Sequence, residues 1–337
     1  MDPAQQLRQL VSGYQVSQAL HVAARLGLSD LLASAPRTVT DLARATSTHE
    51  PTLGRLLRAL MSIDVYELDA EGMIVNTELS ELLRSDVPGS VQGWAAFFGR
   101  SHHWQSWGGL YDSVLTGENA FTAVHGTSVW EYRRQRPEEQ GAFDRAMTSR
   151  TGAVTDSVVD AYDFGRFGTV ADIGGGAGAL LAAILERYPR VHGVLFDQPD
   201  VVADAGPLFE RAGVESRYEK ADGSFFESVP AGADAYLLKA VIHDWSDADS
   251  VTILRACRRA VPAHGTVLLV EQLLGQGPEP VRTAFSDLNM LVGPGGQERT
   301  VDEYRDLLEA AGFVLTEVTE TGTPVFVIAA TPTETGG

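Results

Sequence analysis

The sequence predicts an α/β protein in which a helical domain precedes a mostly parallel sheet. Three observations lead to this prediction. Before about residue 85, apolar residues recur at helical spacing. From residue 168, short strand-like runs alternate with helical stretches, which is typical of a parallel sheet covered by helices on both faces. The last two apolar runs, 314–318 and 324–330, lie too close together for a parallel crossover, so we expect the chain to end in an antiparallel hairpin.

The N-terminal domain is predicted to contain helices followed by a hairpin. Thr40 offers a hydroxyl that can cap a short helix, and Pro51 suits the first turn of the next one. Two short apolar runs, 65–68 and 73–75, then flank residues 69–72, whose composition is typical of a hairpin turn. Helix, turn, helix and hairpin in this order form the winged-helix pattern.

The length of 337 residues agrees with two domains. We assign residues 1–100 to the winged-helix-like domain and residues 101–337 to a second, larger domain. The first part of the larger domain, 101–160, is predicted to be helical and is rich in aromatic residues. The alternating strands and helices follow it.

Composition restricts the possible partners. The net charge is −19, with 26 Lys and Arg against 45 Asp and Glu. Nucleic acid and anionic membranes are therefore poor partners, because binding phosphates needs clustered cations. We find no apolar run near the ~18 residues of a membrane span, and no secretory signal at the N-terminus. The single cysteine, Cys257, is expected to be a buried thiol, and a cytoplasmic location is expected.

The strongest motif is Asp172–Gly178, a glycine-rich loop between a strand and a helix. Its glycines let the backbone approach a ligand and expose amides at a helix N-terminus. The next strand ends in Asp197, which can accept hydrogen bonds from two ribose hydroxyls. The loop alone leaves three possibilities: S-adenosylmethionine (SAM), a dinucleotide, whose pattern Gly174 and Gly176 also fit, or a structural turn. Asp172 favours SAM, because a carboxylate repels a pyrophosphate and attracts a cationic amino group.

Two more segments follow strands at the same edge, where open parallel sheets bind ligands. Ser224 and Phe225 follow the third strand, so that Ser224 can contact a base and Phe225 can form an apolar wall. A turn followed by core phenylalanines is the alternative. Lys239 ends the fourth strand, where a lysine either binds a ligand or extends to solvent; we favour the ligand contact.

His243 follows the fourth strand and is the candidate general base. A phenol has a pKa of about 10, so it is a weak nucleophile until a base such as histidine takes its proton. A carboxylate can orient the imidazole, and Glu271 or Glu298 can do so. A structural histidine is the alternative. We predict no metal, because the adjacent His102 and His103 would point in different directions on a helix.

Together these motifs resemble a known family. The sequence resembles the class I SAM-dependent O-methyltransferases of the plant caffeate and flavonoid type and their bacterial polyketide-tailoring relatives. The resemblance covers nearly the whole chain. Besides the winged-helix start, it is carried by Asp172–Gly178, Phe196–Pro199, Gly223–Phe226, Leu238–Trp245 and Gly295–Thr300.

The resemblance implies a Rossmann-like sheet, a winged-helix domain that forms an intertwined homodimer without binding DNA, and SAM as cofactor, with S-adenosylhomocysteine (SAH) as product. It implies His243 as base, flanked by Glu271 and Glu298. The residues that it implies for SAM are Gly174 with its neighbours, Asp197, Ser224, Phe225, Lys239 and Arg150. Many relatives have aspartate in place of Ser224, so the adenine contact can depend on the backbone here.

The resemblance also places an acceptor pocket among the aromatic helices and the helix around Asp287. The predicted wall residues are Trp94, Phe98, His102, Trp104, Phe143, Met147, Asp287, Asn289 and Met290. Packing within the core is the alternative for each of them. Aromatic walls suit a flat acceptor, and the bacterial relatives suggest a polyketide or naphthoate-like intermediate.

Two other functions stay open on the sequence alone. One is a winged-helix regulator with a ligand-sensing domain, although its recognition helix would carry only Arg55 and Arg58 as cations. The other is a dinucleotide-dependent enzyme. The intact histidine argues against family members that keep SAM but perform other chemistry.

Overall fold

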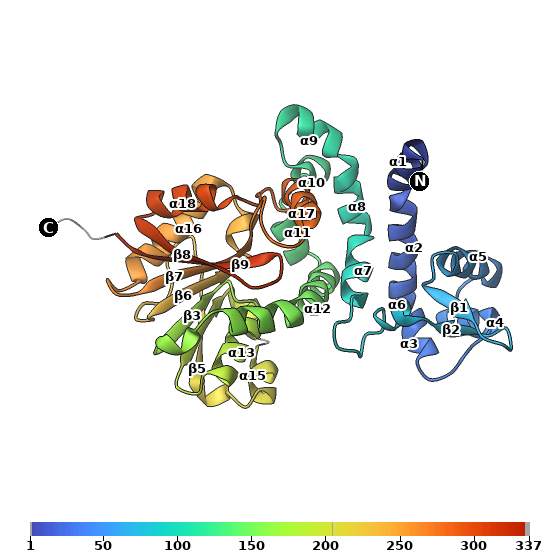
Figure 1. The fold of residues 1–337 in the computed structure, drawn as a ribbon, viewed down its shortest axis with the longest axis horizontal. Coiled ribbons are helices and arrows are strands. Elements are labelled where there is room, and N and C mark those ends of the chain that lie inside the picture. The colour runs from blue at the N-terminus through green and yellow to red at the C-terminus, as the bar shows by residue number, and fades with distance from the viewer. Residues whose placement is uncertain (1, 204, 334–337) are drawn as a thin grey trace. The chain divides into compact units, whose positions relative to one another are not determined.

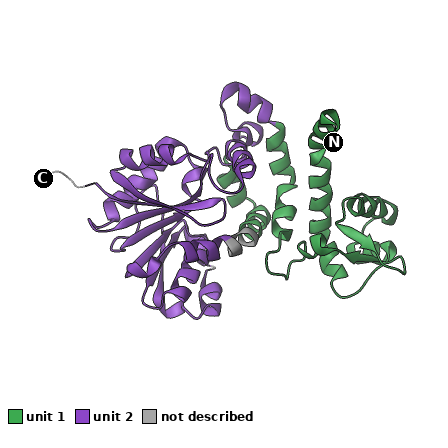
Figure 2. Cartoon of the chain, viewed as in Figure 1, with its two compact units in different colours: residues 1–108, 127–152 green, residues 109–126, 153–337 purple. Residues whose placement is uncertain are grey.

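The computed structural model describes residues 2–203 and 205–333, with the side chains of residues 148–153 outside the description. The chain forms two compact units (Figure 2). The first consists of residues 1–108 and 127–152, and the second of residues 109–126 and 153–337. Because the chain passes between the units at three points, no single position separates them; the predicted domain boundary near residue 100 stays a prediction.

The first unit is helical apart from a two-stranded hairpin (Figure 1). Its helices are α1 (Pro3–Val11), α2 (Gly13–Leu26), α3 (Leu28–Leu32), α4 (Val39–Thr46), α5 (Glu50–Met61), α6 (Glu78–Glu81), α7 (Gln92–Phe98), α8 (Ser101–Gly108), α11 (Val129–Arg134) and the first part of α12 (Pro137–Ala161). The strands β1 (Tyr66–Leu68) and β2 (Ile74–Asn76) pair antiparallel, and Gly72 takes a positive φ of 77° in the turn between them. This confirms the predicted hairpin.

The prediction for the cap of α4 was wrong. Thr38, not Thr40, caps this helix: its hydroxyl accepts a hydrogen bond from the N–H of Asp41 at 3.1 Å, and the Asp41 carboxylate accepts one from the Thr38 N–H. This is a reciprocal capping box. Thr40 is the second residue of the helix and donates to Glu50 instead. The Thr-x-x-Asp spacing that begins at Thr38 was the sequence signal.

The second unit is built on a seven-stranded sheet (Figure 1). Its strands are β3 (Thr169–Ile173), β4 (His192–Asp197), β5 (Tyr218–Asp222), β6 (Ala235–Lys239), β7 (Thr266–Gln272), β8 (Phe313–Glu320) and β9 (Val325–Pro332). They lie in the order β5-β4-β3-β6-β7-β9-β8. The strands β3 to β7 are parallel, and β9 pairs antiparallel with both β7 and β8. This confirms the predicted α/β fold with a C-terminal hairpin.

The other elements of the second unit are helices, and several of them cover the two faces of the sheet. They are α9 (Leu110–Thr116), α10 (Ala120–His125), the end of α12, α13 (Ala179–Arg187), α14 (Pro199–Ala203), α15 (Gly206–Arg211), α16 (Asp247–Ala260), α17 (Pro280–Val292) and α18 (Val301–Ala310), with short 3₁₀ turns η1 (Phe164–Arg166), η2 (Glu215–Arg217) and η3 (Ile242–Asp244). No helix within residues 2–203 and 205–333 is long and apolar enough to cross a membrane.

The alternation of side chains along each strand explains the two covered faces. Val170 of β3 belongs to a buried cluster with Leu181 of α13, whereas its neighbour Ala171 belongs to another with Leu254 of α16. Cys257 lies fully buried in the second cluster, as predicted. Strand β3 lies between β4 and β6, where the strand order reverses, and such a point opens a ligand crevice at the carboxyl ends of the strands.

Candidate active site

The glycine loop leads from the end of β3 into α13. Gly174, Gly176 and Gly178 have φ values of 70°, 59° and 80°, a region that strains other residues. Gly178 is the N-cap of α13. The backbone N–H of Gly174 is bonded to the Phe196 carbonyl at 2.8 Å, which ties the loop to the end of β4. The loop thus brings exposed backbone to the carboxyl edge of the sheet.

Asp197 at the end of β4 is bonded to this loop. Its Oδ2 accepts the N–H of Gly176 at 2.8 Å, and its Oδ1 accepts the N–H of Gln198 at 2.7 Å. Burial raises the pKa of Asp197, and these two N–H groups oppose the change. A carboxylate has about four lone-pair positions, so Asp197 can accept further hydrogen bonds from a ligand.

Asp172 lies beneath the loop and is only 1% exposed. A Cβ on Gly175 would lie 2.6 Å from its Oδ2, so only glycine fits above it. Its Oδ1 has no hydrogen-bond partner among the described residues. Burial raises the pKa of Asp172 to about 7, although the nearby Lys239 opposes the change. A buried carboxyl oxygen without a hydrogen-bond partner favours a cationic donor, which would stabilise its ionised form.

The other predicted cofactor residues lie in different surroundings. The Phe225 ring lies beside the loop, where a Cβ on Gly174 would approach it to 3.4 Å. The Ser224 hydroxyl accepts the N–H of Phe226 at 3.4 Å, so this side chain begins a local turn. Lys239 ends β6 and is half-buried. The side chain of Arg150 lies outside the described residues.

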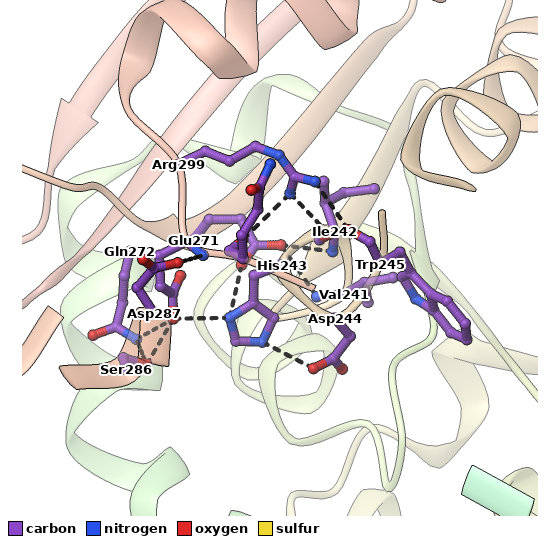
Figure 3. A network of polar contacts seen from close by, with 12 residues as sticks. Val241, Ile242, His243, Asp244, Trp245, Glu271, Gln272, Ser286, Asp287 and Arg299 are labelled. Carbon is purple, nitrogen blue, oxygen red and sulfur yellow. Dashed lines mark hydrogen bonds and ion pairs between the residues drawn. The ribbon is translucent and has the colours of Figure 1, made fainter. Parts of the chain in front are cut away.

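The segment that carries His243 begins directly after β6. Ala240 has a φ of 53°, an uncommon value for a residue with a side chain. The chain then turns so that the N–H groups of Val241 and Ile242 both donate to Glu271 Oε1, at 3.1 and 2.8 Å (Figure 3). Glu271, on β7, is thereby a support for the backbone that carries His243.

Glu298 contacts the imidazole itself. Its Oε1 lies 3.1 Å from His243 Nδ1, whereas Glu271 Oε2 lies 3.9 Å from the same nitrogen. The same Glu298 oxygen accepts hydrogen bonds from Gln272 Nε2 at 3.0 Å and Ser286 Oγ at 2.7 Å. The sequence left open which glutamate contacts His243, and the geometry gives the hydrogen bond to Glu298.

The acidic neighbours determine the charge of His243. Burial lowers the pKa of its ring, but the carboxylates of Glu298, Glu271 and Asp244 outweigh burial and raise the pKa to about 10. Asp244 Oδ1 lies 3.7 Å from Nε2. Burial also raises the pKa of Glu271 to about 7. The ring therefore lies in an environment that stabilises a bound proton.

The loop at residues 295–300 contacts the backbone around His243. Arg299, which is fully buried, donates to the carbonyls of Ile242 at 3.1 Å and Trp245 at 2.9 Å. The N–H of Gln297 donates to the His243 carbonyl at 2.9 Å. A Cβ on Gly296 would clash with that carbonyl oxygen. Sequence reasoning missed these contacts, together with those of Gln272 and Ser286, although the loop itself carried part of the resemblance.

A family model of the O-methyltransferase domain matches residues 107–314, more than half of the chain. The chain belongs to the O-methyltransferase family. A second model, of the O-methyltransferase dimerisation domain, matches residues 8–86. This confirms the resemblance: the protein is a SAM-dependent O-methyltransferase and a homodimer.

Individual proteins agree with this assignment. The phenazine O-methyltransferase PhzM of Lysobacter antibioticus is 44% identical to this O-methyltransferase over 326 residues, which cover 97% of this chain and 95% of the relative. The crystal structure of LaPhzM matches with a TM-score of 0.94 at 43% identity, over 98% of this chain and 100% of that one. NcsB1 from neocarzinostatin biosynthesis, solved with SAM and 2-hydroxy-5-methyl naphthoic acid, matches with a TM-score of 0.82 at 32% identity, over 94% and 96% of the two chains.

In the second unit of this O-methyltransferase, α17 carries three predicted acceptor residues. Asp287 Oδ1 accepts the N–H of Glu298 at 3.0 Å, so Asp287 holds the loop that carries Glu298. Asn289 and Met290 follow two and three residues later in the same helix. Asn119 donates to the carbonyls of Leu291 and Gly293, which fixes the end of α17. Sequence reasoning did not identify Asn119.

The first unit contains the other six predicted acceptor residues. The rings of Trp94 and Phe98 lie 3.8 Å apart between centroids. Phe98, Phe143 and Met147 pack against the buried cluster around Phe97. By contrast, Trp104 lies 6.4 Å from the ring of Tyr14, and His102 Nδ1 lies 3.3 Å from a carboxylate oxygen of Glu139. Across residues 2–203 and 205–333, no group of three or more His, Cys, Asp or Glu could hold a metal ion.

Proposed function

We propose that this enzyme transfers the methyl group of SAM to a phenolic hydroxyl of a flat aromatic intermediate, such as a naphthoate or a related polyketide, with His243 as general base. The observation that supports it best is the imidazole at the carboxyl edge of the sheet, whose Nδ1 lies 3.1 Å from Glu298. If Nδ1 carries the hydrogen and donates it to the carboxylate, the opposite nitrogen, Nε2, is the proton acceptor.

We assign the cofactor to the loop after β3 and its neighbours. The oxygen of buried Asp172 that has no hydrogen-bond partner among the described residues suits the cationic amino group of the methionine part. Asp197 suits the ribose hydroxyls, since each of its oxygens keeps a free lone pair. Phe225 and Ser224 are proposed for the adenine side, and Lys239 and Arg150 for the SAM carboxylate. SAM itself supplies a methyl group already bonded to a good leaving group.

His243 then has one proton to accept. Because its acidic neighbours raise the pKa of the ring to about 10, it holds a phenolic proton more strongly than a free imidazole does. At neutral pH most protein molecules therefore carry a protonated His243. The fraction of molecules with an unprotonated ring, which can act as a base, grows as pH rises. Alignment of the hydroxyl with the methyl group supplies the remaining acceleration.

The aromatic acceptor is supported by the bacterial relatives. PhzM is a phenazine O-methyltransferase, and NcsB1 was solved with a naphthoic acid. The acceptor residues predicted in each unit remain part of this proposal. We also propose a cytoplasmic location, which the single, buried Cys257 supports because disulfides are rare in that compartment.

Product analysis tests the proposed function directly. The homodimer is incubated with SAM and a panel of hydroxynaphthoic acids and hydroxyphenazines, and products are followed by mass spectrometry and SAH release. Matched controls are the same ring systems with the hydroxyl already methylated or replaced by an amine. We expect methyl ethers from at least one phenol and no product from the blocked controls. Methylation of the amines alone, or no SAH with any phenol, would contradict the proposal.

A further inference from the structure

The backbone around His243 is held by side chains and not by a regular element. The base belongs to η3, a turn of three residues between β6 and α16, and such a short turn has little rigidity of its own. Glu271 binds the N–H groups before the base, and Arg299 binds the carbonyls on either side of it. Arg299 is thus placed to determine where the imidazole lies.

Arg299 has no exposed surface. Its Nη1 donates to the Ile242 carbonyl at 3.1 Å, and its Nη2 donates to the Trp245 carbonyl at 2.9 Å and to Asp247 Oδ1 at 2.8 Å. The third nitrogen, Nε, also donates to Asp247 Oδ1, at 3.0 Å. A planar guanidinium with five donors in a fixed fork can bind all these groups at once, which an ammonium cannot do.

The same loop carries the carboxylate that contacts the base. Glu298 is the residue before Arg299, and its Oε1 lies 3.1 Å from His243 Nδ1. The loop therefore binds the base twice, by its ring through Glu298 and by its backbone through Arg299. Figure 3 shows the guanidinium and the imidazole on opposite sides of this segment.

We propose that Arg299 is the positioning residue of His243: by binding the carbonyls of Ile242 and Trp245, it fixes the imidazole at the place where the acceptor hydroxyl must lose its proton. This inference rests on the proposed role of His243 as base. Arg299 itself contacts neither substrate nor cofactor in this account. Its effect is on kcat, because a base displaced by about 1 Å can slow a reaction by as much as 100-fold while leaving ligand contacts intact.

The test compares Arg299→Lys with a matched arginine elsewhere in the same unit. Arg217 also binds carbonyls, those of Leu185, Tyr188 and Val191, but on the opposite side of β3 and far along the chain from the base. We expect Arg299→Lys to lower kcat about tenfold or more, with the SAH dissociation constant unchanged within about twofold. Arg217→Lys should leave kcat unchanged even if it lowers thermal stability.

The pH profile separates positioning from general stability. Glu298, Glu271 and Asp244 are the charged groups around the ring, and they raise the pKa of His243. Loosening the contact with Glu298 should move the rising limb of kcat/KM to lower pH in Arg299→Lys and not in Arg217→Lys. If Arg299→Lys fails to fold, Asp247→Asn serves, since it removes the charge of the exposed carboxylate that pairs with Arg299 and also accepts from Gln297 Nε2, and it should cause a smaller change in the same direction.

Nuclear magnetic resonance of labelled histidine gives a readout that does not depend on turnover. The His243 signal, assigned by its absence in His243→Ala, should titrate at lower pH in Arg299→Lys than in the wild-type homodimer. An unchanged signal together with an unchanged kcat would overturn the role of Arg299. A changed signal in Arg299→Lys, together with a wild-type enzyme that methylates no phenol, would instead refute the proposed function and leave the positioning role intact.

Discussion

The two ends of the active site are built in different ways. The loop after β3 exposes its backbone, and the N–H of Gly176 is bonded to Asp197, 21 residues further along the chain. The base segment after β6 depends on side chains from distant segments, among them Glu271 and Arg299. Sequence motifs can therefore predict the first region and can name His243, Glu271 and Glu298 in the second, whereas the contacts of Arg299 and Ser286 that hold them appear only when the chain is folded.

The largest expected effect comes from a pair of glycines, one in each region. Gly296→Ala places a Cβ against the His243 carbonyl, so the loop or the base must move. Gly176→Ala has open space around the new Cβ and only the strain of a positive φ of 59°. We expect Gly296→Ala to lower turnover at least about 100-fold, and Gly176→Ala to cost about 1–2 kcal/mol of stability.

Steady-state rates and urea unfolding of both alanine variants measure this difference. Equal losses of turnover in the two variants would mean that the backbone around His243 is no more tightly packed than the glycine loop after β3.

The next effect concerns cofactor affinity. Asp197→Asn removes the charge from a carboxylate that we assign to the ribose, and charge-assisted hydrogen bonds contribute about 1.5–3 kcal/mol. We therefore expect SAH to bind about 10- to 100-fold more weakly by calorimetry. Glu298→Gln is the matched change in the other region and should leave SAH affinity unchanged. A similar loss of affinity in both variants would show that the two regions are coupled.

Glu298→Gln should instead change the pH profile. Glu298 is the first of the carboxylates that raise the pKa of His243 to about 10. In the wild type, kcat/KM should rise with pH up to about that value, because the unprotonated ring is the base. The variant should show its rising limb at lower pH and a maximum rate about tenfold lower. If the rising limb of kcat/KM stays at the same pH in the variant, the group that titrates is not His243.

The smallest expected effect is a pH trend in stability at Asp172. Its folded-state pKa is raised by burial to about 7, above the usual value of about 4. Its contribution to stability is therefore present below about pH 4 and is lost as pH rises through 7. Urea unfolding should show that the free energy of unfolding falls less between pH 5 and pH 8 in Asp172→Asn than in the wild type. Parallel curves would mean that Asp172 stays ionised throughout.

These differences explain how much the sequence could predict. The strands around the glycine loop, with Asp172 in β3 and Asp197 at the end of β4, were predicted correctly because local periodicity and one motif specify them. Thr40 was wrongly chosen as a cap because two hydroxyls lie near the same helix start, and only the geometry separates them. Arg299 and Asn119 were missed because their partners lie far away in sequence, and no spacing rule connects them.

The most direct test of the central claim, that His243 is the base and is separable from the cofactor site, is made on His243→Ala. SAH binding is measured by calorimetry, and methyl transfer to a phenol accepted by the wild type is measured on the same sample. The account predicts an SAH dissociation constant within about twofold of the wild type and methyl transfer slower by about 100-fold or more. Unchanged methyl transfer, or a loss of SAH binding as large as the loss of rate, would contradict it.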